Sequence, residues 1–313
     1  MSKEDNIFMG VDVSKDHLDI YYNSKHEKIR NNIKAIRDFI RFELRGKDVA
    51  IRLCVVESTG GYEKVIMKLL QESGIMVHRA HPNKVYAFAK AKGHFAKTDR
   101  LDSVLLEQYA AFIADNVTGD EIISELQEEL KALKAIETDL EIALQANKNR
   151  MHNLQGRALS YLKKQIKFYE KQLEQIRKDI DILISEDDNL SKKQKIITSY
   201  KGVGKKTASV LLIELPELGK LTNKEIASLV GLAPKTNESG KKIYKAHISG
   251  GRFIVRRALY MAALVAARYN QRIQVFYAKL IAAGKALKVA LVAVMRKIII
   301  CLNSMLKYNT FFT

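Results

Sequence analysis

The sequence predicts three successive structural parts: an α/β domain, a helical arm and a mainly α-helical C-terminal domain. In residues 1–116, short apolar runs alternate with amphipathic helical patterns. Residues 117–190 contain no proline and carry a long apolar repeat of helical period, and residues 191–313 are rich in alanine, leucine and lysine. With 313 residues, of which 47% are hydrophobic, the chain can build two or three domains with packed cores.

The order of elements in the N-terminal part predicts its fold. Strands are expected at residues 7–13, 18–22, 27–31, 51–57 and 75–80. Helices are expected at residues 32–45, 61–73 and 99–115, and a further helix begins at Pro82, where the missing N–H group of proline is harmless. Three strands of a meander followed by alternating helices and strands favour an RNase H-like α/β domain.

The middle of the chain predicts two long helices. One apolar run of helical spacing consists of Leu126, Leu130, Leu133, Leu140 and Leu144. A second run, with alternating steps of four and three residues, consists of Leu162, Ile166, Tyr169, Leu173, Ile176, Ile180 and Leu183. Such heptad spacing is typical of a coiled-coil arm. The arm can be a hairpin within one chain or a dimerisation arm between two chains, and the sequence leaves both open.

Positive charge is concentrated in the last third of the chain. The whole chain carries a formal net charge of +18. Residues 1–115 and 116–190 carry net charges of +3 and −4, whereas residues 191–313 carry +19. A field of this size attracts polyanions, of which nucleic acid is the most common, although solubility or binding to an anionic membrane are alternatives.

Several classes of protein are disfavoured by the remaining composition. Cys54 and Cys301 are the only cysteines and lack metal-ligand spacing, so we expect neither a zinc site nor a disulfide framework. The N-terminus has no signal-peptide core. The apolar run at residues 289–302 is interrupted by Arg296 and Lys297, which indicates a buried helix. We therefore expect a cytoplasmic protein without membrane contact.

Four carboxylates fall where an RNase H-like fold would bring them together. Asp12 and Glu57 end two predicted strands, and Asp99 and Asp102 share one face of a predicted helix. Clustered carboxylates need a counterion, and such oxygen ligands favour Mg²⁺ or Mn²⁺, which can serve phosphoryl transfer. Each acid alone could be a helix cap or turn residue. GVDVSK could also be the phosphate loop of an actin-like kinase, but the chain has few of the other glycine-rich loops that such a kinase needs.

Residues 198–213 (TSYKGVGKKTASVLLI) predict a helix-hairpin-helix motif. Gly202 and Gly204 permit a tight turn, and the N–H groups that begin the second helix can hold a phosphate. Lys205 and Lys206 add positive charge. We expect these four residues to bind nucleic acid, with an ordinary glycine turn between two helices as the alternative.

Residues 231–257 combine two serines with clustered cations. A serine can attack a phosphodiester where cations neutralise the growing charge on the phosphate, which arginine does with two N–H groups at once. Ser239 and Ser249 are the candidates, although both could be turn residues of a loop that only binds DNA. The cations expected to contact nucleic acid are Lys241, Lys242, Arg252, Arg256 and Arg257.

Taken together, the motifs resemble the IS110 family of bacterial insertion-sequence transposases, also called DEDD transposases. The N-terminal motifs are GVDVSKDHLDI, VVESTGGYE and KTDRLDS, and the C-terminal motifs are GVGKKTA, LVGLAPKTNESG and ISGGRFIVRRALYMAAL. The resemblance implies a RuvC-like domain with a catalytic, metal-binding tetrad that maps to Asp12, Glu57, Asp99 and Asp102. It further implies a coiled-coil arm at residues 117–190 and a C-terminal transposase domain, whose catalytic serine corresponds to Ser239 rather than Ser249.

The resemblance also implies partners. Members of the family act on donor and target DNA and assemble as oligomers, such as dimers or tetramers, and some use a structured guide RNA. We therefore expect a Mg²⁺-dependent, RNA-guided transposase that acts at the nucleoid in the cytoplasm and uses Ser239 as its nucleophile. One alternative is a RuvC-like, structure-specific hydrolytic nuclease, which would leave the basic serine domain unexplained. The other is a non-catalytic nucleic-acid-binding assembly protein.

Overall fold

The structure, a computed structural model, forms two compact units, Met1–Ile123 and Ser124–Thr313. It describes residues 7–58, 60–93, 99–117, 119–120, 124–234, 238–239, 242–243 and 247–312. Of residues 99–100, 238–239 and 242–243 only the backbone is described. Each unit has its own hydrophobic core, and each is described separately below.

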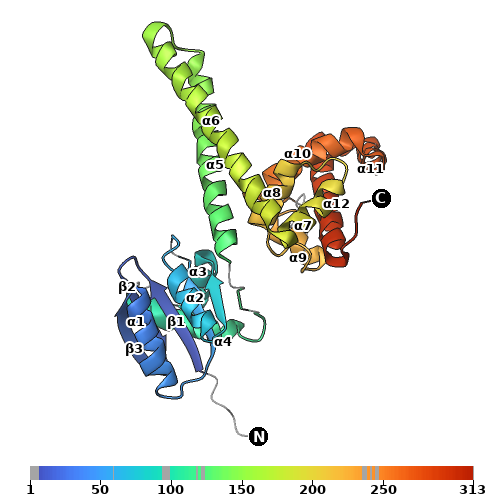
Figure 1. Ribbon diagram of the computed structural model, residues 1–313. Coiled ribbons are helices and arrows are strands. Elements are labelled where there is room, and N and C mark those ends of the chain that lie inside the picture. The colour runs from blue at the N-terminus through green and yellow to red at the C-terminus, as the bar shows by residue number, and fades with distance from the viewer. Residues whose placement is uncertain are drawn as a thin grey trace. The chain divides into compact units, whose positions relative to one another are not determined.

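A mixed five-stranded sheet forms the centre of the first unit (Figure 1), with the strand order β3-β2-β1-β4-β5. The strands are β1 (Ile7–Val13), β2 (His17–Tyr22), β3 (Lys25–Arg30), β4 (Ile51–Glu57) and β5 (Val77–Ala80). The first three form an antiparallel meander, and β4 lies parallel to both β1 and β5. This sheet is compatible with the RNase H-like domain that the sequence predicts.

Helices cover both faces of this sheet. One apolar core is built with α1 (Ile33–Phe39), the π-helical segment η1 (Ile40–Arg45) and α2 (Lys64–Glu72). The other is built with α3 (Pro82–Ala91) and α4 (Asp99–Ile113). Because successive strand residues point to opposite faces, Met9 and Val11 enter the first core while Leu53 and Val55 enter the second.

Several elements of this unit differ from their predicted bounds; β5, for example, begins at Val77 rather than at residue 75. Strand β3 begins at Lys25 rather than at residue 27, and the helix predicted for residues 32–45 is divided into α1 and η1. The helix predicted for residues 61–73 begins only at Lys64, because Gly60 and Gly61 have φ values of +62° and +95°, which lie outside the right-handed helical region.

Two long helices of the second unit, α5 (Glu125–Met151) and α6 (Gly156–Glu186), pack along each other as a hairpin (Figure 1). An ion pair of 2.7 Å joins Lys148 to Glu170, and another of 2.8 Å joins Arg177 to Glu137, so the two helices run antiparallel. The predicted seam of α6 is mostly buried, at Leu162, Ile166, Leu173, Ile176 and Ile180. The two helices thus pair within one chain, while a coiled-coil supercoil or a dimer stays a prediction.

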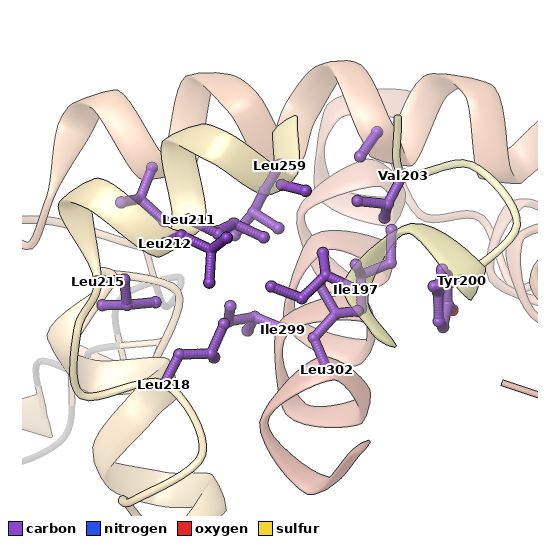
Figure 2. Close-up of a cluster of buried hydrophobic side chains, with 14 of the residues drawn as sticks. Ile197, Tyr200, Val203, Leu211, Leu212, Leu215, Leu218, Leu259, Ile299 and Leu302 are labelled. Atoms are coloured by element: carbon purple, nitrogen blue, oxygen red, sulfur yellow. The ribbon is translucent and has the colours of Figure 1, made fainter. Parts of the chain in front are cut away.

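The rest of the second unit is a bundle of helices around one core. Its helices are α7 (Asp188–Ser199), α8 (Lys205–Glu214), α9 (Asn223–Leu229), α10 (Phe253–Tyr269), α11 (Gln271–Ala282) and α12 (Leu287–Tyr308). Figure 2 shows how Ile197 of α7, Leu211 of α8, Leu259 of α10 and Ile299 of α12 meet in this core. Two short strands, β6 (Glu238–Ser239) and β7 (Lys242–Ile243), pair between α9 and α10.

The last helix, α12, extends beyond the apolar run at residues 289–302 in both directions. It is separate from α11, because α11 ends at Ala282, Gly284 has φ +75°, and α12 begins only at Leu287. By length and composition alone α12 could cross a membrane, yet 56% of its most apolar window is buried in the core of the unit. It therefore serves as a core helix here.

Candidate functional site

Two of the predicted carboxylates meet at one edge of the sheet, which we call the carboxylate edge. Val11 of β1 pairs with Val56 of the parallel strand β4, so the next residues lie side by side: Asp12, the last but one of β1, and Glu57, the last of β4. Val11 points into the core with α1 and α2, and Val55 points into the core with α4. By alternation, Asp12 and Glu57 both lie on the face that α4 covers.

A glycine allows α4 to lie directly on β1. A methyl group on Gly10 would overlap the main-chain oxygen of Ser103 and the main-chain nitrogen of Glu107. Beyond the end of α4, Asp115 forms an ion pair of 2.5 Å with Arg52 at the start of β4. Helix α4 therefore runs antiparallel to β1 and β4, and its first turn points toward the carboxylate edge.

The two other predicted acids lie in that first turn. Helix α4 begins at Asp99, whose side chain lies outside the described residues, and Asp102 is half-buried one turn later. Among the described side chains, no three acidic, histidine or cysteine groups form a ready-made metal site. Even so, oxygen ligands from two strand ends and one helical turn suit a hard divalent cation, and Asp99 would complete the set.

A fifth carboxylate continues the row across the sheet. Asp12 pairs with Asp19 of β2, and Asp19 pairs with Lys28 of β3. Asp19 is buried, and its carboxylate lies 3.2 Å from Nζ of Lys28 and 3.5 Å from Nε2 of His26. Lys28 thereby offsets a charge that would otherwise repel Asp12 across the strand pair. The signal in the sequence is the alternation around Asp19, which puts Leu18 and Ile20 in the core and the acid on the opposite face.

Buried Glu63 shapes the loop that follows Glu57. Its side chain, which is 2% exposed, accepts a hydrogen bond of 2.9 Å from the N–H of Gly61 and lies 3.5 Å from Nη1 of Arg79. This loop contains the glycines that a nucleotide-binding kinase could have used. The carboxylate of Glu63 instead points inward and fixes the loop directly after Glu57.

The segment predicted to form a helix-hairpin-helix motif consists of the end of α7, a turn that contains Gly202 and Gly204, and most of α8. Gly202 has φ +114°, and a methyl group there would come within 2.8 Å of Cβ of Ala266 in α10. Gly204 precedes α8 with open space around it, and no described side chain caps the helix. The first N–H groups of α8, at Lys205 and Lys206, therefore remain available for an anion.

Ser239 lies on the hairpin of β6 and β7, where its backbone pairs with that of Lys242. The side chains of both residues, and the whole of Lys241, lie outside the described residues. The two ends of the surrounding segment are closed on each other, because Gly231 and Gly251 approach so closely that a methyl group on either would overlap the backbone of the other turn. The GLAP and SGGR motifs thus close the loop that carries Ser239.

Two of the predicted DNA-binding arginines are held by hydrogen bonds within the second unit. Arg252 donates two hydrogen bonds of 2.5 Å to the carboxylate of Glu217 and one of 2.9 Å to the main-chain oxygen of Glu214. Arg256 donates to the main-chain oxygens of Val230 (3.1 Å) and Gly250, one from each turn. Arg256 thus joins the two turns that close the loop, and Arg252 anchors the start of α10, while their expected contact with nucleic acid stays a prediction.

Two other predicted cations converge on an acid of α5. Lys206 and Arg257 each lie 2.6 Å from an oxygen of Glu141, whereas Lys205 is exposed and has no ion pair among the described residues. Sequence reasoning did not point to Glu141, because the partners lie 65 and 116 residues away along the chain. The acid itself looks like an ordinary solvent-facing residue of a long charged helix.

Two protein-family models match the chain. A DEDD transposase model of the IS110 type, described simply as transposase, matches residues 9–156, which include Asp12, Glu57, Asp99 and Asp102. A model described as the transposase IS116/IS110/IS902 family matches residues 194–278, which include the helix-hairpin-helix motif and Ser239.

Similar proteins are found among known sequences. The pilin gene-inverting proteins of Moraxella bovis and Moraxella lacunata are each 25% identical over 312 residues, and the match covers 96% of both chains. The insertion element IS110 uncharacterized 43.6 kDa protein of Streptomyces coelicolor is 34% identical over 119 residues, which are 37% of this chain and 29% of that relative. The Moraxella matches therefore span both structural units.

Proposed function

Because the chain belongs to the IS110 family of transposases, we propose that it cuts and rejoins DNA with Ser239 as nucleophile and a Mg²⁺-dependent carboxylate site. Family membership makes it a DNA transposase in general terms, and a DEDD domain implies a divalent metal of some kind. The structural observation behind the proposal is the carboxylate edge, where Asp12 and Glu57 lie near the ends of the neighbouring strands β1 and β4 on the face that α4 covers.

The tetrad of Asp12, Glu57, Asp99 and Asp102 would hold the metal. Mg²⁺ or Mn²⁺ held there would withdraw electron density from a phosphate oxygen and so favour attack of a hydroxyl on the phosphorus atom. Gly10 would help to bring these acids together, because it lets α4, which contains Asp99 and Asp102, lie directly on the sheet. Asp19 lies next to them but is already paired with Lys28.

In the chemical step, the Oγ atom of Ser239 forms a bond to phosphorus while the bond from phosphorus to one DNA oxygen breaks. The proton of the serine hydroxyl ends on the released DNA oxygen, which leaves as a hydroxyl, so atoms and charges balance. The phosphoserine link retains the energy of the broken bond, and a second DNA hydroxyl can reverse the step without ATP. Lys241 and Lys242, which follow Ser239 in sequence, would neutralise the charge that develops on the phosphate.

Guide RNA and assembly are further parts of the proposal. The net charge of +19 on residues 191–313 can neutralise several phosphates of donor DNA, target DNA and a structured guide RNA. We place the protein at the nucleoid in the cytoplasm, as a homo-oligomer. A RuvC-like hydrolytic nuclease and a non-catalytic assembly protein are the competing functions.

The decisive experiment traps the covalent intermediate. A suicide DNA substrate with a nick beside the scissile phosphate should leave a protein–DNA adduct that survives denaturation, and mass spectrometry should place it on the peptide around Ser239. Ser239→Ala should abolish both adduct and recombinant product while DNA binding persists. The matched control is Ser249→Ala, which should retain the adduct.

Each other function gives a different result. Cleavage with free ends and no adduct in the wild type would indicate the hydrolytic nuclease. DNA binding without cleavage, indifferent to both serines and to Asp12→Asn, would indicate the assembly protein. Loss of the adduct in Ser249→Ala alone would identify Ser249 as the nucleophile.

A further inference from the structure

Three cations from three different helices converge on one carboxylate in the second unit. Nη2 of Arg177 in α6 lies 2.7 Å from Oε1 of Glu141, and Nζ of Lys206 in α8 lies 2.6 Å from the same oxygen. Nη2 of Arg257 in α10 lies 2.6 Å from Oε2. Glu141 itself belongs to α5, so one side chain connects the α5–α6 hairpin to the helix-hairpin-helix motif and to the helix that follows the serine loop.

A second, deeper acid supports this arrangement. Glu137, one turn before Glu141, is 2% exposed and lies 2.5 Å from Nζ of Lys134 and 2.8 Å from Nε of Arg177. The cluster thus contains four cations and two carboxylates. The cluster therefore keeps a net positive charge after its ion pairs have formed, and this charge would attract a further anion.

Within the cluster, Glu141 is more buried than the three cations that contact it. The side chain of Glu141 is 18% exposed, whereas those of Arg177, Lys206 and Arg257 are 42%, 60% and 54% exposed. An arginine has five N–H donors and a lysine three, so each cation can hold Glu141 and keep donors directed to solvent. A groove of about 820 Å³ opens beside Arg177 and Arg257, and its charged lining is completed by Glu141, Lys148 and Glu170, while Lys206 lies outside it.

We propose that Arg177, Lys206 and Arg257 form a cradle for a phosphate of duplex DNA, and that Glu141 positions them. This inference rests on the proposed action on DNA. Because Arg177 belongs to α6, it adds a DNA contact on the α5–α6 hairpin to those expected from the C-terminal domain. Three flexible cationic side chains from separate helices would repel one another without a shared acid. Glu141 fixes them before DNA arrives, so less conformational freedom is lost on binding.

The first test removes the cations one at a time in the full-length protein. Affinity for a labelled DNA duplex is measured over a range of salt concentrations. Arg177→Ala, Lys206→Ala and Arg257→Ala should each weaken binding and lower the slope of log affinity against log salt by about 1, as expected for one lost phosphate contact. Arg177→Lys, which keeps the charge, should retain the slope. Unchanged slopes in all three alanine variants would overturn the cradle.

The second test concerns the sign of the effect of Glu141. Simple electrostatics predicts that Glu141→Gln tightens DNA binding, because the groove becomes more positive. Positioning predicts weaker binding, by about tenfold if the loss resembles that of other supporting groups. Glu141→Asp should recover part of the affinity. Glu129→Gln, which removes an exposed carboxylate elsewhere on α5, is the matched control for net charge and should leave affinity unchanged.

The outcomes separate this proposal from others. Tighter binding by Glu141→Gln would mean that the acid competes with phosphate rather than positioning the cations. Lower thermal stability of the alanine variants with normal salt slopes would reduce the cluster to a structural clamp. The salt dependence of the alanine variants is also measured with an RNA of equal length, which shows whether the cradle binds DNA or RNA. Loss of RNA binding alone would overturn the assignment to DNA. A normal Ser239 adduct combined with normal slopes would remove the cradle and leave the proposed chemistry intact.

Discussion

Gly10 of β1 and Ser103 of α4 touch backbone to backbone, and there is no room for a side chain between them. Gly10→Ala should therefore push α4 off the sheet and lower the free energy of unfolding by about 2 kcal/mol or more, as overpacked cores do. Urea denaturation measures the effect. Gly204→Ala is the control, since its surroundings are open and its φ of −87° suits any residue. Equal losses in the two variants would contradict the close approach.

Much of the first unit could be predicted from the sequence because its signals are local. Short apolar runs and apolar alternation located all five strands, and a carboxylate near the end of a buried strand located Asp12 and Glu57. What these patterns cannot supply is which residues of neighbouring strands face each other. The pairing of Asp12 with Asp19, and of Asp19 with Lys28, depends on the register of a short meander and emerged only from the structure.

The limits are greater in the second unit, where the important contacts are between distant residues. Clustered cations after Ser239 indicate nucleic acid, but a cation in a sequence does not reveal its partner. Arg252 is held by Glu217, and Arg257 is held by Glu141, which lies 116 residues earlier. Such ion pairs follow from helix packing, which no local pattern encodes. Three predicted site residues, Asp99, Ser239 and Lys242, have side chains outside the described residues, and Lys241 lies outside them entirely.

Neutralising Asp12 should affect Mg²⁺ binding more than neutralising its neighbour Asp19. Asp12→Asn should weaken Mg²⁺ binding at least about tenfold, because a ligand is lost. Asp19→Asn should change it much less, because Lys28 already offsets the charge of Asp19. Isothermal titration of the folded variants with Mg²⁺ makes the comparison. Similar losses in both would make Asp19 a ligand rather than a neighbour.

Glu141 also predicts how stability depends on pH. Burial raises its pKa, but the hydrogen bond and charge of Lys206, together with Lys134 and Arg257, outweigh burial and lower the pKa from 4.5 to about 2. A carboxylate with a lowered folded pKa stabilises the fold fully above its unfolded pKa and loses that contribution as pH falls toward the folded value. Stability should therefore decline between about pH 4.5 and pH 2.

Urea unfolding at a series of pH values tests this expectation. Glu141→Gln should be less stable than the wild type at neutral pH, and its stability should change less over the acidic range. Glu129→Gln should follow the wild-type profile. If Glu141→Gln retains the full acidic decline, other carboxylates are responsible for it.

The α5–α6 hairpin predicts a difference between its two faces. Leu173 and Ile176 are buried in the apolar seam, whereas Phe168 and Ile182 on the same helix are more than half exposed. Placing aspartate at both buried positions should cost more than about 3 kcal/mol, because unpaired charge enters an apolar seam. The same change at the two exposed positions should cost far less. Thermal unfolding measures the difference.

Light scattering then shows whether the apolar seam of α6 packs only within one chain or also between two chains. Since α5 of the same chain packs along α6, the buried-face variant should keep the mass of the wild-type assembly while its melting temperature falls. A smaller assembly would show that the seam also joins two chains. A loss of mass in the exposed-face variant alone would place the contact between chains on the opposite side of the helix.

Arg252 and Lys205 should separate folding from DNA binding. Arg252 is held by three hydrogen bonds inside the second unit, so Arg252→Ala should lower the free energy of unfolding by about 1–2 kcal/mol, a modest value because the pair is partly exposed. Lys205 is exposed at the start of α8, so Lys205→Ala should change stability by less than about 0.5 kcal/mol but lower the salt slope of DNA binding by about 1. Urea denaturation and binding titrations on both variants provide the four values. If Arg252→Ala instead lowers the salt slope and leaves stability unchanged, Arg252 contacts DNA directly and its pairing with Glu217 gives way when DNA binds.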